Sequence, residues 1–233
     1  MFLLDFRPDE ITAIKRSRRG ATGAAAGSLP LGILTALLLA RGRFWGRGAL
    51  DILVHLPLVL PPVVTGYVLL LLFGRHGPIG HFLEATIGVV FAFRWTGAAL
   101  ASAVMGFPLM VRAIRLGIEA VDRRLEEAAG TLGAPPLWVF FTVTLPLMLP
   151  GIIAGTILAF ARSLGEFGAT ITFVSNIPGE TETVPTAIFS LTQVPGGDAG
   201  ALRLTLVAIL LSVVALVASE VAARGAARRV AGL

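Results

Sequence analysis

Long apolar stretches recur along this chain, and they limit its possible folds more than any other feature. Residues 52–73 (ILVHLPLVLPPVVTGYVLLLLF) contain no Asp, Glu, Lys or Arg, and about 20 apolar residues are enough for a helix to cross a bilayer. Charged residues make up only 14% of the chain, whereas soluble domains contain about 25%. The sequence therefore predicts an all-α, polytopic membrane helix bundle.

Five segments have the length and apolarity of membrane spans, within a single transmembrane domain over residues 1–233. The predicted spans cover residues 21–40, 52–73, 96–114, 148–170 and 203–220, with loops at 74–95 and 175–200. The third span is rich in Gly, Ala and Ser, which let helix backbones approach closely, so we expect it to be buried. The basic residues 1–20 and the apolar residues 21–40 together are similar to a signal peptide, but the basic region is too long, no A-x-A cleavage site directly follows the apolar segment, and further spans come after it.

The second predicted span is interrupted by prolines. Pro61 and Pro62 remove amide donors and clash with the preceding turn, and Thr65 follows them. Inside a bilayer the freed carbonyls must be satisfied by protein or by a wet cavity. The bend is therefore either a kink that serves packing or a part of the wall or gate of a pathway.

The fourth predicted span contains Arg162, Ser163, Gly165 and Glu166. An ionisable residue at the centre of a span costs about 2.5–3.5 kcal/mol on insertion scales. Arg162 and Glu166 are four residues apart on one helical face, so a mutual ion pair would reduce this cost. Such a pair either fixes helix packing or flanks a hydrophilic path, to which Ser163 would add a hydroxyl.

The distribution of basic residues gives an orientation. Residues 175–200 contain no Lys or Arg, which is typical of a translocated loop. With the C-terminus in the cytoplasm, five spans place the N-terminus outside. Ten basic residues then lie inside: Arg41, Arg43, Arg47, Arg112, Arg115, Arg123, Arg124, Arg224, Arg228 and Arg229. Five N-terminal ones lie outside, against the positive-inside rule: Arg7, Lys15, Arg16, Arg18 and Arg19.

Residues 119–146 (EAVDRRLEEAAGTLGAPPLWVFFTVTLP) form the longest charged, helix-forming segment of the chain. Apolar residues recur there at helical spacing up to Leu132. Gly133 is well placed to end the helix, two prolines prevent its continuation, and a second helix is predicted from about Leu137. We interpret the 119–146 segment as a short cytoplasmic helix pair that a separate motor protein grips and moves.

Several kinds of chemistry have no motif in the sequence. A phosphate-binding loop needs G-x-x-x-x-G-K-[ST], and the one lysine, Lys15, is followed by Arg16. There is no G-x-S-x-G elbow, no H-E-x-x-H and no cysteine, and the three histidines have no ligand spacing. We therefore predict no catalytic site, no metal site and no cofactor on this chain. Nucleic acid is not an expected partner, because the basic residues flank apolar runs.

The 119–146 segment resembles the EAA loop of ABC-importer permeases, with valine where that family usually has isoleucine. The motif is carried by Glu127, Ala128, Ala129, Gly133, Val143, Leu145 and Pro146. The resemblance extends over about residues 50–220, where LPLVLPPVVTGYVLLLLFGRHGPIG and LAFARSLGEFGATITFVSNIPGETETVPTAI are similar to permease subunits of molybdate importers. Residues 11–27 depart from the family, in which a more apolar first span is expected.

The resemblance implies a subunit of the bacterial inner membrane that acts as a homodimer in contact with membrane lipid. Its implied partners are two copies of an ABC ATPase, which bind ATP and Mg²⁺, and a periplasmic or lipid-anchored oxyanion-binding protein. Residues implied to couple to the ATPase are Glu126, Glu127, Ala128, Ala129, Gly133, Leu145 and Pro146. Residues expected in the translocation path or gate are Pro61, Pro62, Thr65, Arg162, Ser163, Gly165 and Glu166.

Other interpretations remain open from the sequence. The cargo could be sulfate, thiosulfate or tungstate, because their permeases are close relatives or their anions are similar. An ion-coupled secondary transporter would be expected to show two repeated halves with matching broken helices, which five spans do not show. An intramembrane enzyme with Glu166 as its acid, or a structural membrane subunit, is the third possibility.

Overall fold

The computed structural model describes residues 8–231, except for the side chains of Asp9 and of residues 226–231. This part of the chain is helical and contains no strand, as predicted. The helices are α1 (Pro8–Arg41), α2 (Arg47–Val59), α3 (Pro62–Phe73), α4 (Pro78–Ile87), α5 (Trp95–Glu119), α6 (Arg123–Thr131), α7 (Pro136–Val139), the π-helix η1 (Phe140–Thr144), α8 (Leu145–Leu164), α9 (Gly168–Val174), α10 (Val184–Thr192) and α11 (Asp198–Ala231).

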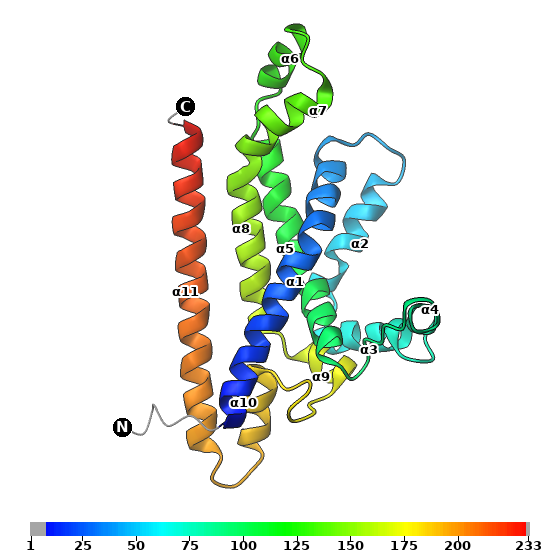
Figure 1. Ribbon diagram of the computed structural model, residues 1–233, viewed down its shortest axis with the longest axis vertical. Coiled ribbons are helices and arrows are strands. Elements are labelled where there is room, and N and C mark those ends of the chain that lie inside the picture. Colours follow the sequence, from blue (N-terminus) through cyan, green and yellow to red (C-terminus); the bar gives the residue numbers. More distant parts are fainter. Residues whose placement is uncertain (1–7, 232–233) are drawn as a thin grey trace.

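The long helices α1, α5, α8 and α11 run alongside one another (Figure 1). Helices α6 and α7 extend beyond the bundle at one end, where α11 also ends. Helices α9 and α10 and the beginnings of α1 and α11 lie at the opposite end. We call these the α6 end and the α10 end. The N-terminus of α1 therefore shares an end with the 175–200 region, which is the arrangement that five spans require.

Within the described residues, four helical segments are long and apolar enough to cross a membrane: Glu10–Arg41, Trp95–Glu119, Pro136–Leu164 and Asp198–Gly225. Helices α2 and α3 make a fifth crossing only if they count as one span, because they are bent by 118°. The bend follows from Pro61 and Pro62: Leu60 is extended, with ψ of 140°, and a proline cannot supply the amide that a continuous helix would need. The predicted interruption is confirmed. Residues 52–73, however, do not form one kinked helix: they lie in two helices that are separated by a sharp bend.

The helix that contains the first predicted span begins at Pro8, well before the predicted start of the span at residue 21. Two polar residues of this early part, Glu10 and Ser17, are buried against the rest of the chain. Glu10 forms a buried ion pair with Arg203 of α11, at 2.7 Å, and the Ser17 hydroxyl accepts a hydrogen bond from the amide of Val184, at 2.7 Å. A hydropathy pattern assigns such polar residues to a loop. In the folded chain they lie within the helix, because distant residues supply their ion pair and hydrogen bond.

Other boundaries also differ from the prediction. The fourth span starts at Pro136 and ends at Leu164 instead of covering 148–170. Helices α4 and α10 occupy parts of the predicted loops 74–95 and 175–200, and α11 extends beyond 203–220 in both directions. The side chains of Arg7, Arg228 and Arg229, used for the predicted orientation, lie outside the described residues.

Helix α5 lies at the centre of the bundle. Its apolar window is 56% buried, against 22% for the windows of Pro136–Leu164 and α11. Met110, Ile114 and Ile118 are fully buried and pack with Met148 of α8 and Leu39 of α1. The predicted burial of the span with small residues is therefore confirmed.

Candidate coupling and translocation sites

The 119–146 segment forms the predicted helix pair. The Asp122 carboxylate caps α6 by accepting a hydrogen bond from the amide of Arg124, at 2.9 Å, which satisfies one of the free donors of the first turn. After α6, Gly133 has φ of +84°, in the left-handed region that glycine adopts without strain. Pro136 then begins α7, since a proline is favourable in the first turn of a helix.

Helix α6 presents an exposed apolar surface. None of its residues is buried, and it projects from the bundle (Figure 1). Leu125 of α6 is 50% exposed, Leu132 at the C-cap of α6 is 89% exposed, and Leu137 of the following helix α7 is 76% exposed. Val121, which begins the periodic apolar face, is buried in the core of the bundle, whereas Leu125 and Leu132 do not cover the bundle. Exposed apolar patches of this kind are typical of interaction surfaces.

The two adjacent glutamates of α6 have different surroundings. Glu127 is exposed to solvent, whereas the Glu126 carboxylate binds the Arg41 guanidinium at the end of α1 through both oxygens; the bond to Nη2 is 2.9 Å long. Glu126 Oε1 also accepts a hydrogen bond from the Thr144 hydroxyl, at 2.6 Å. We call this three-residue contact the Glu126 junction. It joins α6 to α1 and to the π-helix before α8.

The electrostatics of the Glu126 junction favour the ionised carboxylate. Partial burial alone would raise the pKa of Glu126, but hydrogen bonds from Arg41 and Thr144 outweigh it, so the pKa lies below its ordinary value of 4.5. Thr144 belongs to a single turn of π-helix, a feature that often occurs at functional sites. A cavity of about 410 Å³ lies beside the junction, between α1, α6 and η1.

The other predicted coupling residues are divided between surface and core. Ala128 and Gly133 are exposed and Ala129 is half-buried. Leu145 packs against the core of α1, α5 and α8, and Pro146 is exposed at the start of α8. Glu127, Ala128 and Gly133 can therefore contact a partner directly, whereas Glu126 and Leu145 face their own chain.

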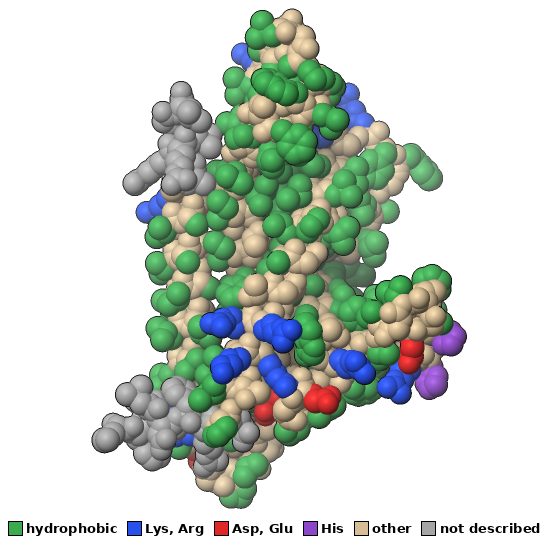
Figure 2. Space-filling view, in the orientation of Figure 1, with side chains coloured by type: hydrophobic (Ala, Val, Ile, Leu, Met, Phe, Trp, Pro, Cys, Tyr) green, Lys and Arg blue, Asp and Glu red, His purple; other side chains and the backbone are tan. Residues whose placement is uncertain are grey.

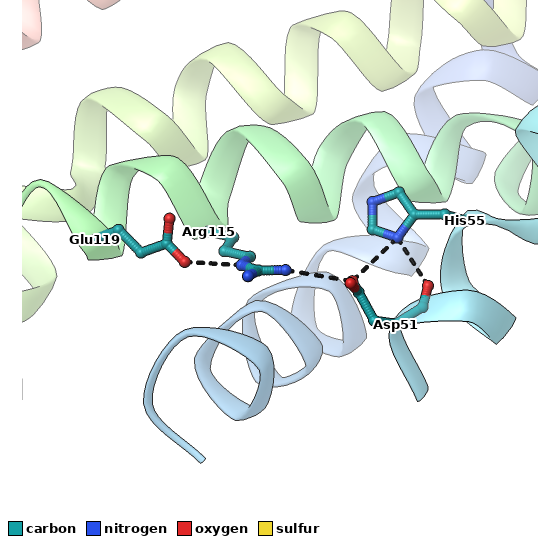
Figure 3. A network of polar contacts seen from close by, with 4 residues as sticks. All are labelled: Asp51, His55, Arg115 and Glu119. Atoms are coloured by element: carbon teal, nitrogen blue, oxygen red, sulfur yellow. Dashed lines mark hydrogen bonds and ion pairs between the residues drawn. The ribbon is translucent and has the colours of Figure 1, made fainter. Parts of the chain in front are cut away.

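A second polar network connects α2 to α5 near the α6 end (Figure 3). Arg115 contacts the carboxylate of Asp51 at 3.3 Å and that of Glu119 at 2.8 Å. His55 Nδ1 lies 2.9 Å from the carbonyl oxygen of Asp51 and 3.3 Å from its carboxylate. Sequence reasoning missed this network and also missed the contact of Arg41 with Glu126. The four-residue spacings of Asp51 with His55 and of Arg115 with Glu119 were the available signal for the network.

The predicted pair of Arg162 and Glu166 is present, with a distance of 2.6 Å. The prediction that both lie on one helix is wrong, because α8 ends at Leu164 and Glu166 lies in the turn before α9. Glu166 is 2% exposed, and its Oε1 accepts a hydrogen bond from the amide of Ala169, at 2.9 Å. Glu166 therefore fixes the α8–α9 turn while Arg162 balances its charge.

Helix α3 packs closely on α9, next to this turn. A Cβ atom at Gly66 would lie 2.5 Å from the carbonyl oxygen of Ala169, and one at Gly168 would lie 2.7 Å from Pro62. Thr65 is 5% exposed, and its hydroxyl has no hydrogen-bond partner among the described residues. The predicted path residues of the second and fourth spans are therefore neighbours, although their helices are about a hundred residues apart in sequence.

A small polar cavity of about 110 Å³ adjoins these residues at the α10 end. Ser163 and Glu166 line it, together with Arg16 and Arg19 of α1. The Ser163 hydroxyl donates to the carbonyl of Ser102, at 3.2 Å. Glu180 and Glu182 also line the cavity, so its charges are mixed and do not form a strong anion site. Among the described residues, no three His, Asp or Glu side chains are grouped as metal ligands.

Comparison with known proteins identifies the family. Residues 28–228 match the family described as "Binding-protein-dependent transport system inner membrane component". The chain is 60% identical over 215 residues to the molybdenum transport system permease protein ModB of Escherichia coli (strain K12), covering 92% of this chain and 94% of that protein. It is 56% identical over 211 residues to ModB of Haemophilus influenzae, covering 91% and 92%.

A solved structure has the same fold. It is a bacterial ABC transporter involved in the import of the acidic polysaccharide alginate, with a TM-score of 0.70, 21% sequence identity, and coverage of 97% of this chain and 81% of that chain. Together with its membrane-spanning helices, the match over residues 28–228 is decisive: this chain belongs to the family of inner-membrane components of binding-protein-dependent transport systems, and it is a multi-pass membrane protein.

Proposed function

We propose that this chain is the single-domain permease subunit of an ATP-driven importer that carries molybdate into the cytoplasm. The cargo is supported by the names of relatives that share 56–60% of their residues over nearly their full length. The observation that carries the mechanism is α6, an unburied helix with the EAA spacing at one end of the bundle. The α6 end then faces the cytoplasm, and the α10 end faces the binding protein.

A separate ATPase supplies the energy in this proposal. It binds ATP and Mg²⁺, and two copies of it receive the exposed surface of α6 in two permease copies. Small Ala128 allows the helix to enter a groove of the partner closely, in the manner of other helix-in-groove contacts. Glu127 is free to accept hydrogen bonds there, since it is exposed to solvent.

The Glu126 junction would carry movement of α6 to the rest of the permease. Helix α1 has 34 residues and is about 51 Å long at 1.5 Å per residue. Its far end is joined to α11 by the Glu10–Arg203 pair and to α10 by Ser17. Movement of α6 would therefore reach the α10 end through one continuous helix, and Thr144 would transmit it to α8 at the same time.

A second copy of the chain is needed for a pathway. The cavity at Ser163 and Glu166 measures only about 110 Å³, and the face of α3 with Pro62, Val63 and Tyr67 is exposed. In a homodimer these faces of α3 would border the path, with the α3–α9 contact as part of a gate near Glu166. Weak binding inside the path suits a carrier, because the anion must be released.

Uptake of radiolabelled molybdate tests the proposed function. Cells that lack their own molybdate permease are given this chain with its ATPase and binding protein, and we expect ATP-dependent uptake that tungstate inhibits and excess sulfate inhibits weakly. Glu127→Lys and Gly133→Trp should abolish uptake while the permease remains in the membrane. Normal ATP-coupled uptake in both variants would refute the coupling role of α6, and uptake without any ATPase would favour a secondary transporter.

A further inference from the structure

An apolar groove, open to the surface, lies between α1, α2 and α5. Its volume is about 700 Å³. Small residues of α1 and α5 leave the space, and larger residues of α2 close one side; its lining includes Gly23, Gly27, Leu53, Pro57, Ala99 and Ala103. On α1 the groove extends from Gly23 to Thr35, about 18 Å at 1.5 Å per residue. This length is close to the roughly 15 Å that one leaflet contributes to the hydrocarbon core.

The outer mouth of the groove is polar, and it is lined by two arginines and one acidic residue, Glu180, so its net charge is positive. Trp95 and Thr96 line the groove and also a second hollow of about 620 Å³ at the α10 end, where Arg16 and Arg94 are exposed or half-buried. The Arg19 guanidinium lies over the Trp95 ring, 4.6 Å from its centre. Figure 2 shows Lys and Arg side chains gathered over the N-terminal half of α1 and continuing across this face.

We propose that the groove and the adjoining hollow bind one anionic phospholipid of the outer leaflet. An acyl chain lies in the groove, and the phosphate lies in the hollow beside Arg94 and Arg16. Tryptophan is enriched at the level of lipid head groups, which places Trp95 at the interface. Each basic residue near a membrane surface attracts anionic lipid. The site also gives a physical reason for basic residues on the outer part of α1, where the positive-inside rule disfavours them.

Other occupants fit the groove and its mouth less well. A helix of a second copy could cover the apolar lining, but it would leave Arg16 and Arg94 at the mouth without an anionic partner. An acidic protein surface would account for the arginines but would leave the apolar groove empty. A phospholipid matches both parts, since it joins an anionic head to a narrow chain.

Quenching of Trp95 fluorescence by brominated lipids tests the proposal in the complete transporter complex in nanodiscs. Trp45 and Trp138 are exposed and lie outside the groove, so Trp45→Phe and Trp138→Phe leave Trp95 as the reporter in the permease. Brominated phosphatidylglycerol should quench it at a lower mole fraction than brominated phosphatidylcholine. Arg94→Gln should raise that mole fraction about fivefold, the effect of one basic residue near the surface. Arg112→Gln, at an exposed position near the other end of α5, is the matched control and should have no effect.

Filling the groove gives an independent measurement. A Cβ atom at Gly27 meets no other atom within 4 Å, so Gly27→Leu should fold normally and displace the lipid. Native mass spectrometry should show the wild-type complex retaining phosphatidylglycerol and the Gly27→Leu complex losing it with its subunits unchanged. Equal quenching by the two lipids, or full lipid retention in Gly27→Leu, would overturn the proposal. So would loss of the second permease copy in Gly27→Leu, because the groove would then hold a partner helix.

Discussion

Replacing Arg41 by alanine would break the Glu126 junction at its cationic side. The side chains of Arg41 and Glu126 are 26% and 19% exposed, which lies between the exposed pairs worth about 0–1 kcal/mol and the buried pairs whose disruption costs about 3–5 kcal/mol. We therefore expect Arg41→Ala to cost about 2 kcal/mol, mostly because the Glu126 carboxylate is left without its cation. Such a cost shifts the equilibrium between attached and detached α6 by about 30-fold.

The measurement is the amount of molybdate transported per ATP hydrolysed by the complete complex in proteoliposomes. Arg41→Ala should retain ATP hydrolysis and lose most of the transport, because the ATPase still holds α6 while α6 no longer moves α1. Arg41→Lys should be intermediate, since lysine supplies the charge without the two-bond geometry. Each of the single changes Arg41→Glu and Glu126→Arg should lower the amount of molybdate transported per ATP hydrolysed. Their combination should recover part of this loss.

The exposed Arg43 provides a control two residues away. Arg43→Ala removes the same charge just beyond the same end of α1 and should leave the ratio of molybdate transported to ATP hydrolysed unchanged. If Arg41→Ala transports as much molybdate per ATP as the wild type, the Glu126 junction does not transmit the movement. If Arg41→Ala merely lowers the amount of permease in the membrane and the exchanged pair recovers nothing, the contact serves stability alone.

Three further predictions follow from the geometry. Gly66→Ala should strongly lower both the melting temperature and transport, because its Cβ would lie 2.5 Å from the backbone oxygen of Ala169. The control Gly165→Ala has open space around the added Cβ, so it should be tolerated in the same thermal-shift and uptake assays. Leu132→Asp should weaken co-purification of the ATPase without changing the melting temperature of the permease, since Leu132 is 89% exposed; unchanged co-purification would exclude this surface. The lowered pKa of Glu126 means that its junction stabilises the fold at every pH above the ordinary value and loses this contribution as pH falls through the folded pKa. The hydrogen-exchange protection factor of α6, which corrects for the pH dependence of intrinsic amide exchange, should therefore be constant from pH 8 to about 5 and fall only below 4.5; a fall near neutral pH would contradict it.

The boundaries of the helices show where a sequence pattern becomes insufficient. Hydropathy identified every long helix, since an apolar run of this length has few alternatives to crossing a bilayer. It placed the start of α1 too late, because Glu10 and Ser17 are polar and are satisfied by Arg203 and Val184. Those partners are more than 160 residues away in sequence, so no local window can detect them.

The prolines of the second predicted span show a similar limit. The sequence indicated an interruption at Pro61 and Pro62, because a proline removes a donor. It could not give the 118° bend, since the direction of α3 after the break depends on its close contact with α9. Gly66 permits that contact with Ala169, and the contact exists only in the folded chain.

The sequence by itself determined the class of the protein: an apolar helical bundle with the spacing of an EAA loop between two spans. These properties depend on local or periodic spacing of residues, so they can be recognised from the sequence alone. Only the tertiary structure decided which of the two adjacent glutamates of α6 faces outward. Glu126 turns inward because Arg41 and Thr144 converge on it from α1 and η1, and such convergence of distant charges is a property of packing in three dimensions.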